Sequence, residues 1–404
     1  MGQMKTASGS PRIAIFTHDT FGLGHVRRCL HIARAVSERA PQASILLITG
    51  TPAKRIFEEL PANADYLKIP TIARTGPKRF RPPHLPLPLG ETTMLRARLI
   101  REALIGFGPD VLLVDNFPLG SRGELRAALQ ELRRCPTRTV LGLRDILDAP
   151  EVVRRDWTRQ GIYEVLDCDY DRILVYGMRE ILDHEEAYAL STHTAAKLRY
   201  CGYVTALAAP AENGADLGLN GRFLLASGGG GGDAYPLLSA FLQALTLIPE
   251  TPAAVVTGPL MSATQRSQLR GLLNGGPHVQ FRDYVPNLRR YMGAADLVVA
   301  MCGYNTAAEI MATGARAVVV PRTWRYGEHQ KGTAAGVEWE QALRASALAR
   351  LGRVTLLEPE TLSPERLADC ISEALSTPTQ PSEIQFNTDG LDRVTDHILA
   401  LSEC

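Results

Sequence analysis

The sequence lacks the features that mark secreted, membrane-spanning and zinc-binding proteins. Its 404 residues include seven cysteines, an odd number without paired Cys-x-x-Cys spacing, which argues against a disulfide framework or a zinc site. No apolar stretch approaches the length of about 18 residues that a membrane-spanning helix needs. Residues 1–11 contain no apolar core of the kind found in secretory signals. We therefore expect a soluble cytoplasmic enzyme whose cysteines are reduced.

An excess of charge of either sign is also absent. The chain has 44 Lys and Arg against 43 Asp and Glu, a formal net charge of +1, so it is not built around non-specific nucleic-acid binding. Hydrophobic residues make up 45% of the sequence and charged residues 22%, as in ordinary globular proteins rather than disordered or fibrous ones. A chain of this length usually forms more than one hydrophobic core, which predicts two domains.

Short continuous apolar runs alternate with helical stretches along both halves of the chain. In the first half the apolar runs are Ile13–Phe16, Ile45–Ile48, Tyr66–Ile69, Val111–Val114, Thr139–Leu143 and Arg172–Tyr176. In the second half they are Phe223–Ala226, Ala254–Val256, Val279–Phe281, Leu297–Ala300 and Ala317–Val320. Uninterrupted apolar strands that are separated by helices predict parallel sheets covered on both faces.

We therefore expect an α/β protein with two doubly wound, Rossmann-like parallel-sheet domains that face each other across a cleft. The first domain covers residues 12–205 and the second covers residues 222–376. Residues 206–221 are rich in Ala and Gly, contain one Pro and are predicted to be a linker. Residues 377–404 form a helical extension that could pack back on the first domain. Ligands of such domains bind at the carboxyl ends of the strands.

The first strand is followed by a glycine-containing turn with the sequence HDTFGLGHVRR, residues 18–28. Gly22 and Gly24 allow a sharp turn and a close approach of a ligand to the backbone. Arg27 occupies the place of the third glycine in the dinucleotide pattern G-x-G-x-x-G, and no ribose-binding acid follows about twenty residues later. The turn is therefore a candidate ligand-binding loop, but NAD is disfavoured as its ligand.

Two histidines of this turn are candidates for proton transfer. His25 is the predicted general base, because imidazole titrates near the working pH of most enzymes. It could instead cap or pack the turn. His18 is the second candidate for the base. Asp115, at the end of the Val111–Val114 strand, could reach the same place and orient an imidazole, as carboxylates do in catalytic triads.

A run of five glycines follows the strand Phe223–Ala226 and precedes a helical pattern. Backbone amides of such a turn, together with the helix N-terminus, suit a diphosphate group. The candidate diphosphate-binding residues are Ser227, Gly228, Gly229, Gly230 and Gly231. No Gly-Lys-Ser/Thr follows, so the turn is not a Walker A loop. A flexible linker is the alternative interpretation.

A third segment, residues 296–321, resembles the nucleotide-sugar half of the GT-B glycosyltransferases. In it a strand is followed by Cys302-Gly303-Tyr304-Asn305-Thr306, by a helix with Glu309, and by an apolar strand that ends at Pro321. The resemblance is greatest to the family that includes the UDP-GlcNAc transferase of peptidoglycan synthesis. It implies that Gly303, Asn305 and Thr306 form the nucleotide-binding turn and that Glu309 binds the donor ribose.

Other segments fit the same family in chain order. The turn at residues 18–28 resembles its glycine-rich first loop, and the five-glycine turn resembles its diphosphate loop. Residues 282–285 resemble the segment that faces the nucleobase, which implicates Tyr284 and Val285. Glu340 and Gln341 resemble the motif that binds the donor sugar, although Glu328-His329-Gln330 offers a competing triplet nearer to Pro321, so Gln330 stays an alternative to Gln341.

The resemblance implies a metal-independent, inverting glycosyltransferase of the hexosyl or N-acetylhexosaminyl type. Its donor would be a nucleotide diphosphate sugar, expected to be a UDP-sugar, and it would need no cofactor. The turn around His25 also resembles the nucleotide-sugar hydrolase of pseudaminic acid synthesis, whose histidine activates water. Hydrolysis is therefore the alternative activity, and an inactive nucleotide-sugar-binding protein is a third interpretation.

Residues 73–102 are rich in proline and basic side chains. Seven basic residues oppose two acidic ones, a net charge of +5 in an otherwise balanced protein. The first half predicts a long loop, and residues 92–107 predict a helix that carries Arg96, Arg98 and Arg101. This segment could meet an anionic acceptor or an anionic membrane surface, which would make the protein peripheral at the membrane. A solvated face is the alternative.

Overall fold

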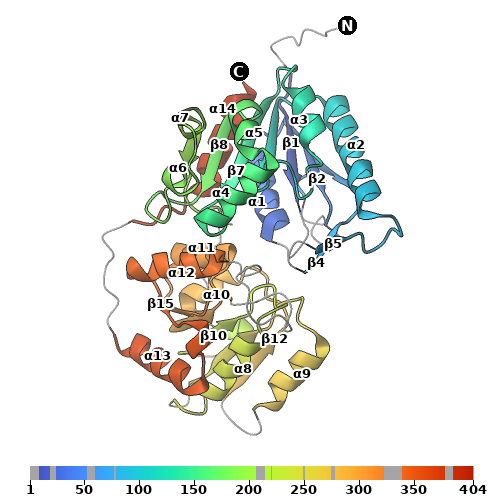
Figure 1. The fold of residues 1–404 in the computed structure, drawn as a ribbon. Helices are drawn as coiled ribbons and strands as arrows, with labels where there is room; N and C mark the ends of the chain where they lie inside the picture. The colour runs from blue at the N-terminus through green and yellow to red at the C-terminus, as the bar shows by residue number, and fades with distance from the viewer. Residues whose placement is uncertain are drawn as a thin grey trace. The chain divides into compact units, whose positions relative to one another are not determined.

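The computed structural model forms two compact units, each described here by itself (Figure 1). Unit 1 comprises Met1–Val204 and Asp389–Cys404, and unit 2 comprises Thr205–Thr388. The residues that the structure describes are 9–18, 24–51, 60–76, 79–205, 214–219, 221–248, 251–273, 278–322, 339–377 and 385–403. Within the predicted linker, the short 3-10 helix η2 (Ala215–Leu217) packs on unit 2, where Leu217 is buried.

Unit 1 contains a seven-stranded sheet in which all neighbours are parallel, in the order β3-β2-β1-β6-β7-β8-β9. The strands are β1 (Arg12–Thr17), β2 (Ser44–Thr49), β3 (Ala64–Lys68), β6 (Val111–Asp115), β7 (Arg138–Arg144), β8 (Arg172–Tyr176) and β9 (Leu198–Tyr200). The central strands β1 and β6 are buried almost throughout, as their unbroken apolar sequences predict.

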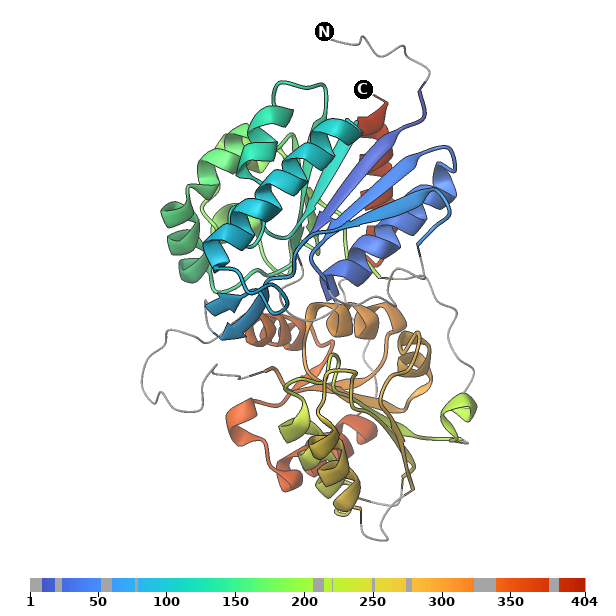
Figure 2. The same cartoon turned by 90° about the vertical axis from the view of Figure 1, so that its right-hand side faces the viewer.

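Helices cover both faces of this sheet. They are α1 (Gly24–Arg39), α2 (Leu89–Phe107), α3 (Arg126–Leu132), α4 (Pro150–Gln160), α5 (Ile162–Cys168), α6 (His184–Ala187), α7 (Thr192–Ala196) and α14 (Gly390–Ser402). One core cluster joins α2, α3, α4 and α5 to one face of the strands. Figure 2 shows α1 and the red α14 on the other side of the sheet from α2, and α14 packs along α1.

Helix α14 belongs to unit 1 although unit 2 precedes it in the chain. Its Val394 and Ile398 are fully buried. Arg39 of α1 forms an ion pair with Asp396, so the helix is also joined to α1 at its surface. Gly390 starts the helix at a point where a Cβ would lie 2.6 Å from the carbonyl oxygen of Gly202, which leaves no room for a side chain.

Unit 2 contains a six-stranded parallel sheet in the order β12-β11-β10-β13-β14-β15. Its strands are β10 (Leu224–Ser227), β11 (Ala253–Val256), β12 (Val279–Arg282), β13 (Leu297–Ala300), β14 (Ala317–Val319) and β15 (Thr355–Leu356). Its helices are α8 (Tyr235–Ala244), α9 (Ala263–Gly271), α10 (Arg289–Ala294), α11 (Tyr304–Thr313), α12 (Glu340–Arg350), α13 (Pro364–Ser376) and the 3-10 turn η3 (Pro359–Thr361).

Both sheets have the doubly wound strand order, so the predicted fold class is confirmed. In each sheet the chain runs outward from the first strand in one direction and later outward in the other. The reversal points lie between β1 and β6 in unit 1 and between β10 and β13 in unit 2. Loops diverge at such points, and ligands of these folds bind at the carboxyl ends of the strands there.

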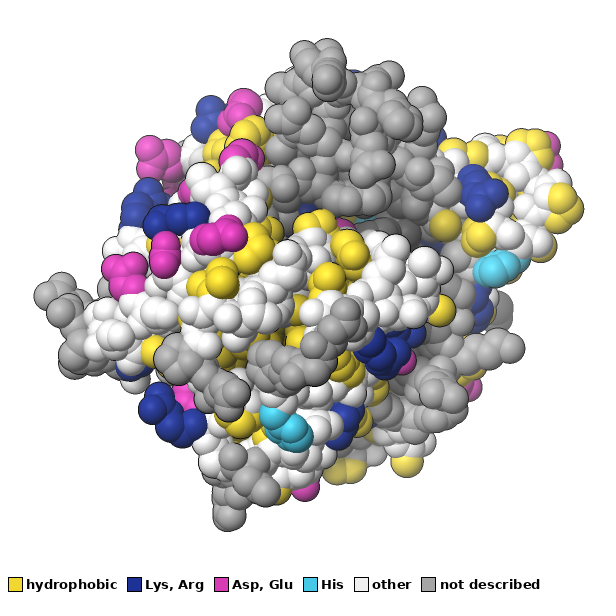
Figure 3. Space-filling model, turned by 90° about the horizontal axis from the view of Figure 1, so that it is seen from below, with side chains coloured by type: hydrophobic (Ala, Val, Ile, Leu, Met, Phe, Trp, Pro, Cys, Tyr) yellow, Lys and Arg dark blue, Asp and Glu magenta, His cyan; other side chains and the backbone are white. Residues whose placement is uncertain are grey.

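The segment between β3 and α2 forms a short antiparallel hairpin, β4 (Ala73–Gly76) and β5 (Arg79–Arg81), that the sequence did not predict. Helix α2 begins at Leu89, three residues before the predicted start. No helix within the described residues is long and apolar enough to cross a membrane. Acidic and basic side chains are interspersed on the face seen in Figure 3, in keeping with a net charge near zero.

Candidate functional site

Three sequence-predicted residues of unit 1 meet at the reversal point of its sheet. His18 follows β1 directly, and Asp115 is the last residue of β6, where it pairs in register with Thr17. His25 lies in the first turn of α1, the helix that follows β1. The register of two adjacent parallel strands therefore brings a histidine turn and a carboxylate to the same edge.

His25 and Asp115 are hydrogen-bonded. The Nδ1 atom of His25 lies 2.5 Å from Oδ2 of Asp115. The carboxylate is fully buried, whereas 14% of the His25 side chain is exposed. Because an ionised carboxylate only accepts hydrogen bonds, Nδ1 carries the proton and donates it. The lone pair of neutral His25 then resides on Nε2, which is the atom that could accept a proton from a ligand.

Arg28, one helical turn after His25, is a second partner of the same carboxylate. Its Nε donates to Oδ1 of Asp115 at 2.9 Å, and its Nη2 donates to Oδ1 at 2.8 Å and to Oδ2 at 2.9 Å. The same Nη2 lies 3.0 Å from Nδ1 of His25. Sequence reasoning gave Arg28 no role. The available signal was its i+3 spacing from His25, which places both side chains on one helix face.

Packing fixes the guanidinium of Arg28. Its carbon lies 5.2 Å from the centre of the Tyr176 ring, and Arg28 is only 3% exposed. Tyr176 can occupy this place because a Cβ on Gly142 would lie 1.8 Å from its hydroxyl oxygen. Burial raises the pKa of Tyr176 well above the usual value, so the ring stays neutral. A glycine in β7 thus makes room for the aromatic wall behind the arginine.

Burial and neighbouring charges shift the pKa values of both Asp115 and His25. Burial alone would raise the pKa of Asp115, but the adjacent Arg28 and His25 hold it well below the usual range. Burial lowers the pKa of His25, Asp115 raises it, and the positive charges of Arg28 and Arg144 lower it further, with a net shift downward. His25 is therefore neutral over most of the pH range in which enzymes work.

His18 contacts His25 but does not share its carboxylate. The two rings meet edge to face with centroids 4.9 Å apart, and the ring of Phe117 lies 3.9 Å from that of His18. Within the described residues, the buried Nδ1 of His18 has no hydrogen-bond partner. Burial lowers the pKa of His18 well below the usual value, as does the neighbouring His25. His18 is thus a neutral wall of the site beside the His25–Asp115 pair.

In unit 2, the five-glycine turn follows β10 and packs against the loop after β11. At Gly231, with φ of 89°, a Cβ would lie 2.3 Å from the carbonyl oxygen of Thr257. A Cβ on Gly228 would meet the same oxygen at 2.7 Å. Within the described residues, the backbone N–H groups of Gly230 and Gly232 donate no hydrogen bond. The turn therefore requires glycine at specific positions and presents unpaired amide donors.

The predicted nucleotide turn lies next to the glycine run. Gly303 precedes α11, and a Cβ on Gly229 would lie 3.8 Å from the hydroxyl oxygen of Thr306 in that helix. Asn305 and Glu309 are half-buried on the same helix, and the pKa of Arg289, which burial lowers, is raised in part by Glu309. The amino-terminal turn of α11 and the turn after β10 thus adjoin, as the adjacency of β10 and β13 requires.

Helix α12 brings the predicted sugar motif to the same edge. Gln341 Oε1 accepts from the backbone N–H of Arg322 at 2.9 Å, and its Nε2 lies 3.8 Å from a Cβ placed on Gly303. Arg344 donates to the carbonyl of Cys302 at 2.9 Å and to Glu340 at 3.0 Å. The carboxylate of Glu340 is thus directed toward Arg344, a contact that sequence reasoning did not anticipate.

The residues predicted to face the nucleobase lie beside the edge of the second sheet. Tyr284 is 49% exposed and Val285 is half-buried in the segment after the edge strand β12. Gly22 and Gln330 lie outside the described residues, whereas Gly24 is the first residue of α1. Within the described part of the chain, no group of three or more His, Cys, Asp or Glu could hold a metal ion.

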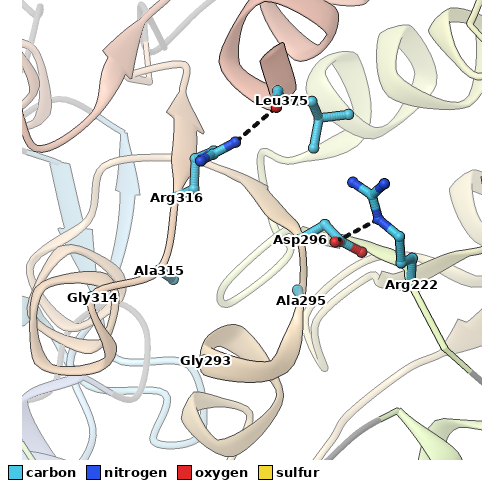
Figure 4. Close-up of a pocket in the computed structure, with 8 residues that line it drawn as sticks. All are labelled: Arg222, Gly293, Ala295, Asp296, Gly314, Ala315, Arg316 and Leu375. Atoms are coloured by element: carbon cyan, nitrogen blue, oxygen red, sulfur yellow. Dashed lines mark hydrogen bonds and ion pairs between the residues drawn. The ribbon is translucent and has the colours of Figure 1, made fainter. Parts of the chain in front are cut away.

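A hollow of about 350 Å³ lies at the opposite end of the second sheet, at the amino ends of its strands (Figure 4). Its charged side chains already serve the fold. Asp296 pairs with Arg222 at 2.9 Å, and Arg316 donates to the carbonyls of Ala374 and Leu375. The hollow contains none of the predicted site residues.

The glycosyltransferase family 28 C-terminal domain matches residues 228–395. A curated UDP-N-acetylglucosamine–N-acetylmuramyl-(pentapeptide) pyrophosphoryl-undecaprenol N-acetylglucosamine transferase from Paenarthrobacter aurescens is 26% identical over 383 residues, 91% of this chain and 89% of its own. The enzyme of the same name from Halalkalibacterium halodurans is 28% identical over 153 residues. That alignment covers 37% of this chain and 39% of the relative, so the chain spans less than half the length of that relative.

Solved structures share the fold at low sequence identity. Acinetobacter baumannii MurG has a TM-score of 0.59 and 13% identity, with 96% of this chain and 99% of that chain covered. A UDP-N-acetylglucosamine 2-epimerase from Listeria monocytogenes, described as putative, has a TM-score of 0.62 and 13% identity, with 97% and 95% covered. With the domain match and the two parallel sheets, these findings show that the chain has the GT-B fold and is similar to the UDP-N-acetylglucosamine transferases.

Proposed function

We propose that the protein transfers a sugar from a UDP-sugar to an acceptor hydroxyl with inversion at the anomeric carbon. The observation that carries the proposal is the pairing of His25 with the buried Asp115 at the reversal point of the first sheet. Such a pair is suited to general-base removal of a hydroxyl proton. In this scheme unit 2 holds the nucleotide and unit 1 supplies the base.

The edge formed by the glycine run and α11 would hold the donor. The unpaired amides of Gly230 and Gly232 suit the diphosphate, and Glu309 would bind the ribose hydroxyls. Tyr284 and Val285 would face the uracil, and Gln341 would reach the sugar, with Ser227, Gly303, Asn305 and Thr306 shaping the turn. Because amide dipoles can stabilise the departing diphosphate, we propose that turnover needs no divalent metal.

The chemical step is a single displacement. As the acceptor oxygen forms its bond to the anomeric carbon, His25 Nε2 takes the hydroxyl proton and the bond from that carbon to the UDP oxygen breaks. Asp115, ionised throughout, accepts the Nδ1–H bond and stabilises the imidazolium that forms. One displacement inverts the configuration of the sugar.

A panel of nucleotide sugars tests the activity directly. Slow release of UDP from one donor without acceptor, accelerated by an acceptor, is the expected result. Fast stoichiometric release of free sugar without acceptor would show that the protein is a hydrolase and not a transferase. No release of nucleotide from any donor, with or without acceptor, would contradict both.

The glycine run generates the first prediction. Gly231→Ala should weaken UDP binding about tenfold or more, because the new Cβ collides with the Thr257 carbonyl and φ of 89° is strained for alanine. Gly232→Ala is the matched control, since its Cβ meets only Leu260 at 3.9 Å. Calorimetry measures the UDP affinity of both variants, once in EDTA and once in Mg²⁺. Equal affinity in the two variants, or binding that requires Mg²⁺, would contradict the proposed diphosphate site.

Glu309 generates the second prediction. A charged hydrogen bond contributes about 1.5–3 kcal/mol, so Glu309→Gln should lower UDP affinity about tenfold or more. Glu373→Ala, an exposed residue of α13, is the control and should bind UDP as the parent protein does. Uridine, deoxyuridine and UDP should be compared by calorimetry. If Glu309→Gln still distinguishes ribose from deoxyribose, another residue reads the sugar hydroxyls.

His25 generates the third prediction. His25→Ala should lower kcat by about 10²–10⁴-fold with UDP affinity nearly unchanged, because a general base acts only in the chemical step. His18→Ala should have the smaller effect, since of the two histidines His25 is the one hydrogen-bonded to Asp115. Steady-state kinetics with the donor from the panel decide between them. An inactive His18→Ala beside an active His25→Ala would exchange the two roles.

The predicted basic segment has a different character from the one expected. Arg96 is buried and pairs with Glu124 at 2.7 Å, and Arg101 pairs with Glu102 and Glu131, so neither is a free surface charge. Arg81 and Arg98 are exposed. Large apolar side chains are exposed beside them, a set we call the α2 surface: Leu85, Leu87, Met94, Leu95, Leu99 and Ile105.

The α2 surface suits an anionic membrane that carries the acceptor. Apolar side chains on a helix face, flanked by arginines, bind membrane interfaces by burying apolar area and by attraction to anionic headgroups. We therefore propose an acceptor that is anionic and membrane-associated. Arg81 and Arg98 would supply the salt-dependent part of the binding.

The α2 surface generates the fourth prediction. Replacing Met94 and Leu99 together by Gln should lower binding to phosphatidylglycerol vesicles about thirtyfold or more, because each apolar side chain contributes about 1–2 kcal/mol when buried in the interface. Leu247→Gln, at a residue 54% exposed on unit 2, is the control. Co-sedimentation at low and high salt measures both. If the parent protein and the double variant sediment equally with the vesicles, the α2 surface is a solvated face that does not bind membranes.

A further inference from the structure

The carboxylate beside His25 is shared between two positively charged or protonatable partners. In a simple histidine–carboxylate pair, an unneutralised carboxylate favours the protonated imidazole. Here Arg28 covers both oxygens of Asp115 with three hydrogen bonds of 2.8–2.9 Å, while His25 has one. Arg28 therefore offsets part of the negative charge that attracts a proton to His25.

The charged groups facing His25 come from four elements. Asp115 comes from β6, Arg28 from the same helix, His18 from the turn after β1 and Arg144 from the end of β7. Asp115 is the one acid among them, and it is paired with Arg28. Burial is the largest influence on the pKa of His25, which it lowers because taking a charged imidazole out of water is unfavourable, and Arg28 lowers that pKa further. Burial, Arg28 and Arg144 oppose protonation of His25, and Asp115 favours it.

The position of Arg28 is determined by its surroundings. Its planar fork donates from Nε and Nη2 to one carboxylate, and its guanidinium carbon lies 5.2 Å from the centre of the Tyr176 ring. Lysine has a single ammonium group and can neither span two oxygens in this way nor stack flat on the ring. The effect of the charge of Arg28 can therefore be separated from the effect of its shape by substitution.

We infer that Arg28 is a positioning residue that keeps His25 neutral and directed toward its ligand, so that the base is ready at and below neutral pH. This inference rests on the proposed role of His25. In the chemical step the acceptor proton moves to Nε2 of His25, which becomes an imidazolium with a guanidinium nitrogen 3.0 Å from its Nδ1. That repulsion favours release of the proton to water after the sugar has been transferred.

The experiment compares Arg28→Met with Arg28→Lys, using UDP-N-acetylglucosamine as the probe and UDP release as the readout. Arg28→Met leaves Asp115 unneutralised, so the pKa of His25 rises and activity is lost first at low pH. The ratio of the rate at pH 8 to that at pH 6 should increase about tenfold or more. Arg28→Lys retains the charge, so the rate of this variant should fall by a similar factor at every pH. The pH at which activity is lost on the acid side of the profile should change little.

Two further measurements keep the test independent of folding and of catalysis. Titration of ¹³C-labelled histidine by NMR, with His25 assigned from the resonance missing in His25→Gln, should give a pKa below the ordinary value of about 6.5 in the parent protein. The same resonance should titrate higher in Arg28→Met if that variant folds. Arg34→Met, on the same helix, is the control and should leave the His25 titration unchanged.

The outcomes separate this inference from the proposed function. A His25 pKa above the ordinary value in the parent protein, or an equal loss of rate at every pH in Arg28→Met, would overturn the role of Arg28. If His25→Gln released UDP as fast as the parent protein, His25 would not be the base. The NMR titration would still decide whether Arg28 keeps it neutral.

Discussion

The buried charge of Asp115 is the constraint around which the carboxyl edge of unit 1 is arranged. A carboxylate with no exposed surface costs several kcal/mol unless it is paired and hydrogen-bonded. Asp115 has both, through Arg28 and His25. Arg28 must then be buried as well, and its face is covered by Tyr176, which fits only because residue 142 is glycine. The side chains of residues on three other elements, α1, β7 and β8, are thus constrained by one acid at the end of β6.

The two units place their candidate residues by the same topological means but use different chemistry. In unit 1 the reversal point carries side chains with charge, the His25–Asp115–Arg28 group. In unit 2 the charged side chains of Glu340 and Arg344 are paired with each other, and the glycine run leaves backbone amides as the donors. The close approach of Gly231 and Gly228 to the Thr257 carbonyl shows why side chains are excluded there. One edge is suited to proton transfer and the other to holding an anion.

Much of this arrangement can be predicted from sequence because it depends on local pattern. The unbroken apolar runs predicted two parallel sheets, and Asp115, at the end of an apolar strand, was expected to reach the same place as His25. The contacts of Arg28 and Arg96 could not be predicted in this way. Both are arginines on helices, where a solvated position is the usual expectation, and both are buried because an acid distant in sequence lies opposite. The β4–β5 hairpin was missed because its strands are only four and three residues long and basic.

Helix α14 has a consequence for the order in which the protein is made. Because α14 packs on α1 of unit 1 but follows unit 2 in the chain, unit 2 is an insertion of 184 residues (205 to 388) within unit 1. A ribosome adds about 5–20 residues per second, so unit 1 waits roughly 10–40 seconds for its last helix. During that time the apolar surface of α1 that Val394 and Ile398 later cover is exposed to other proteins in the cell.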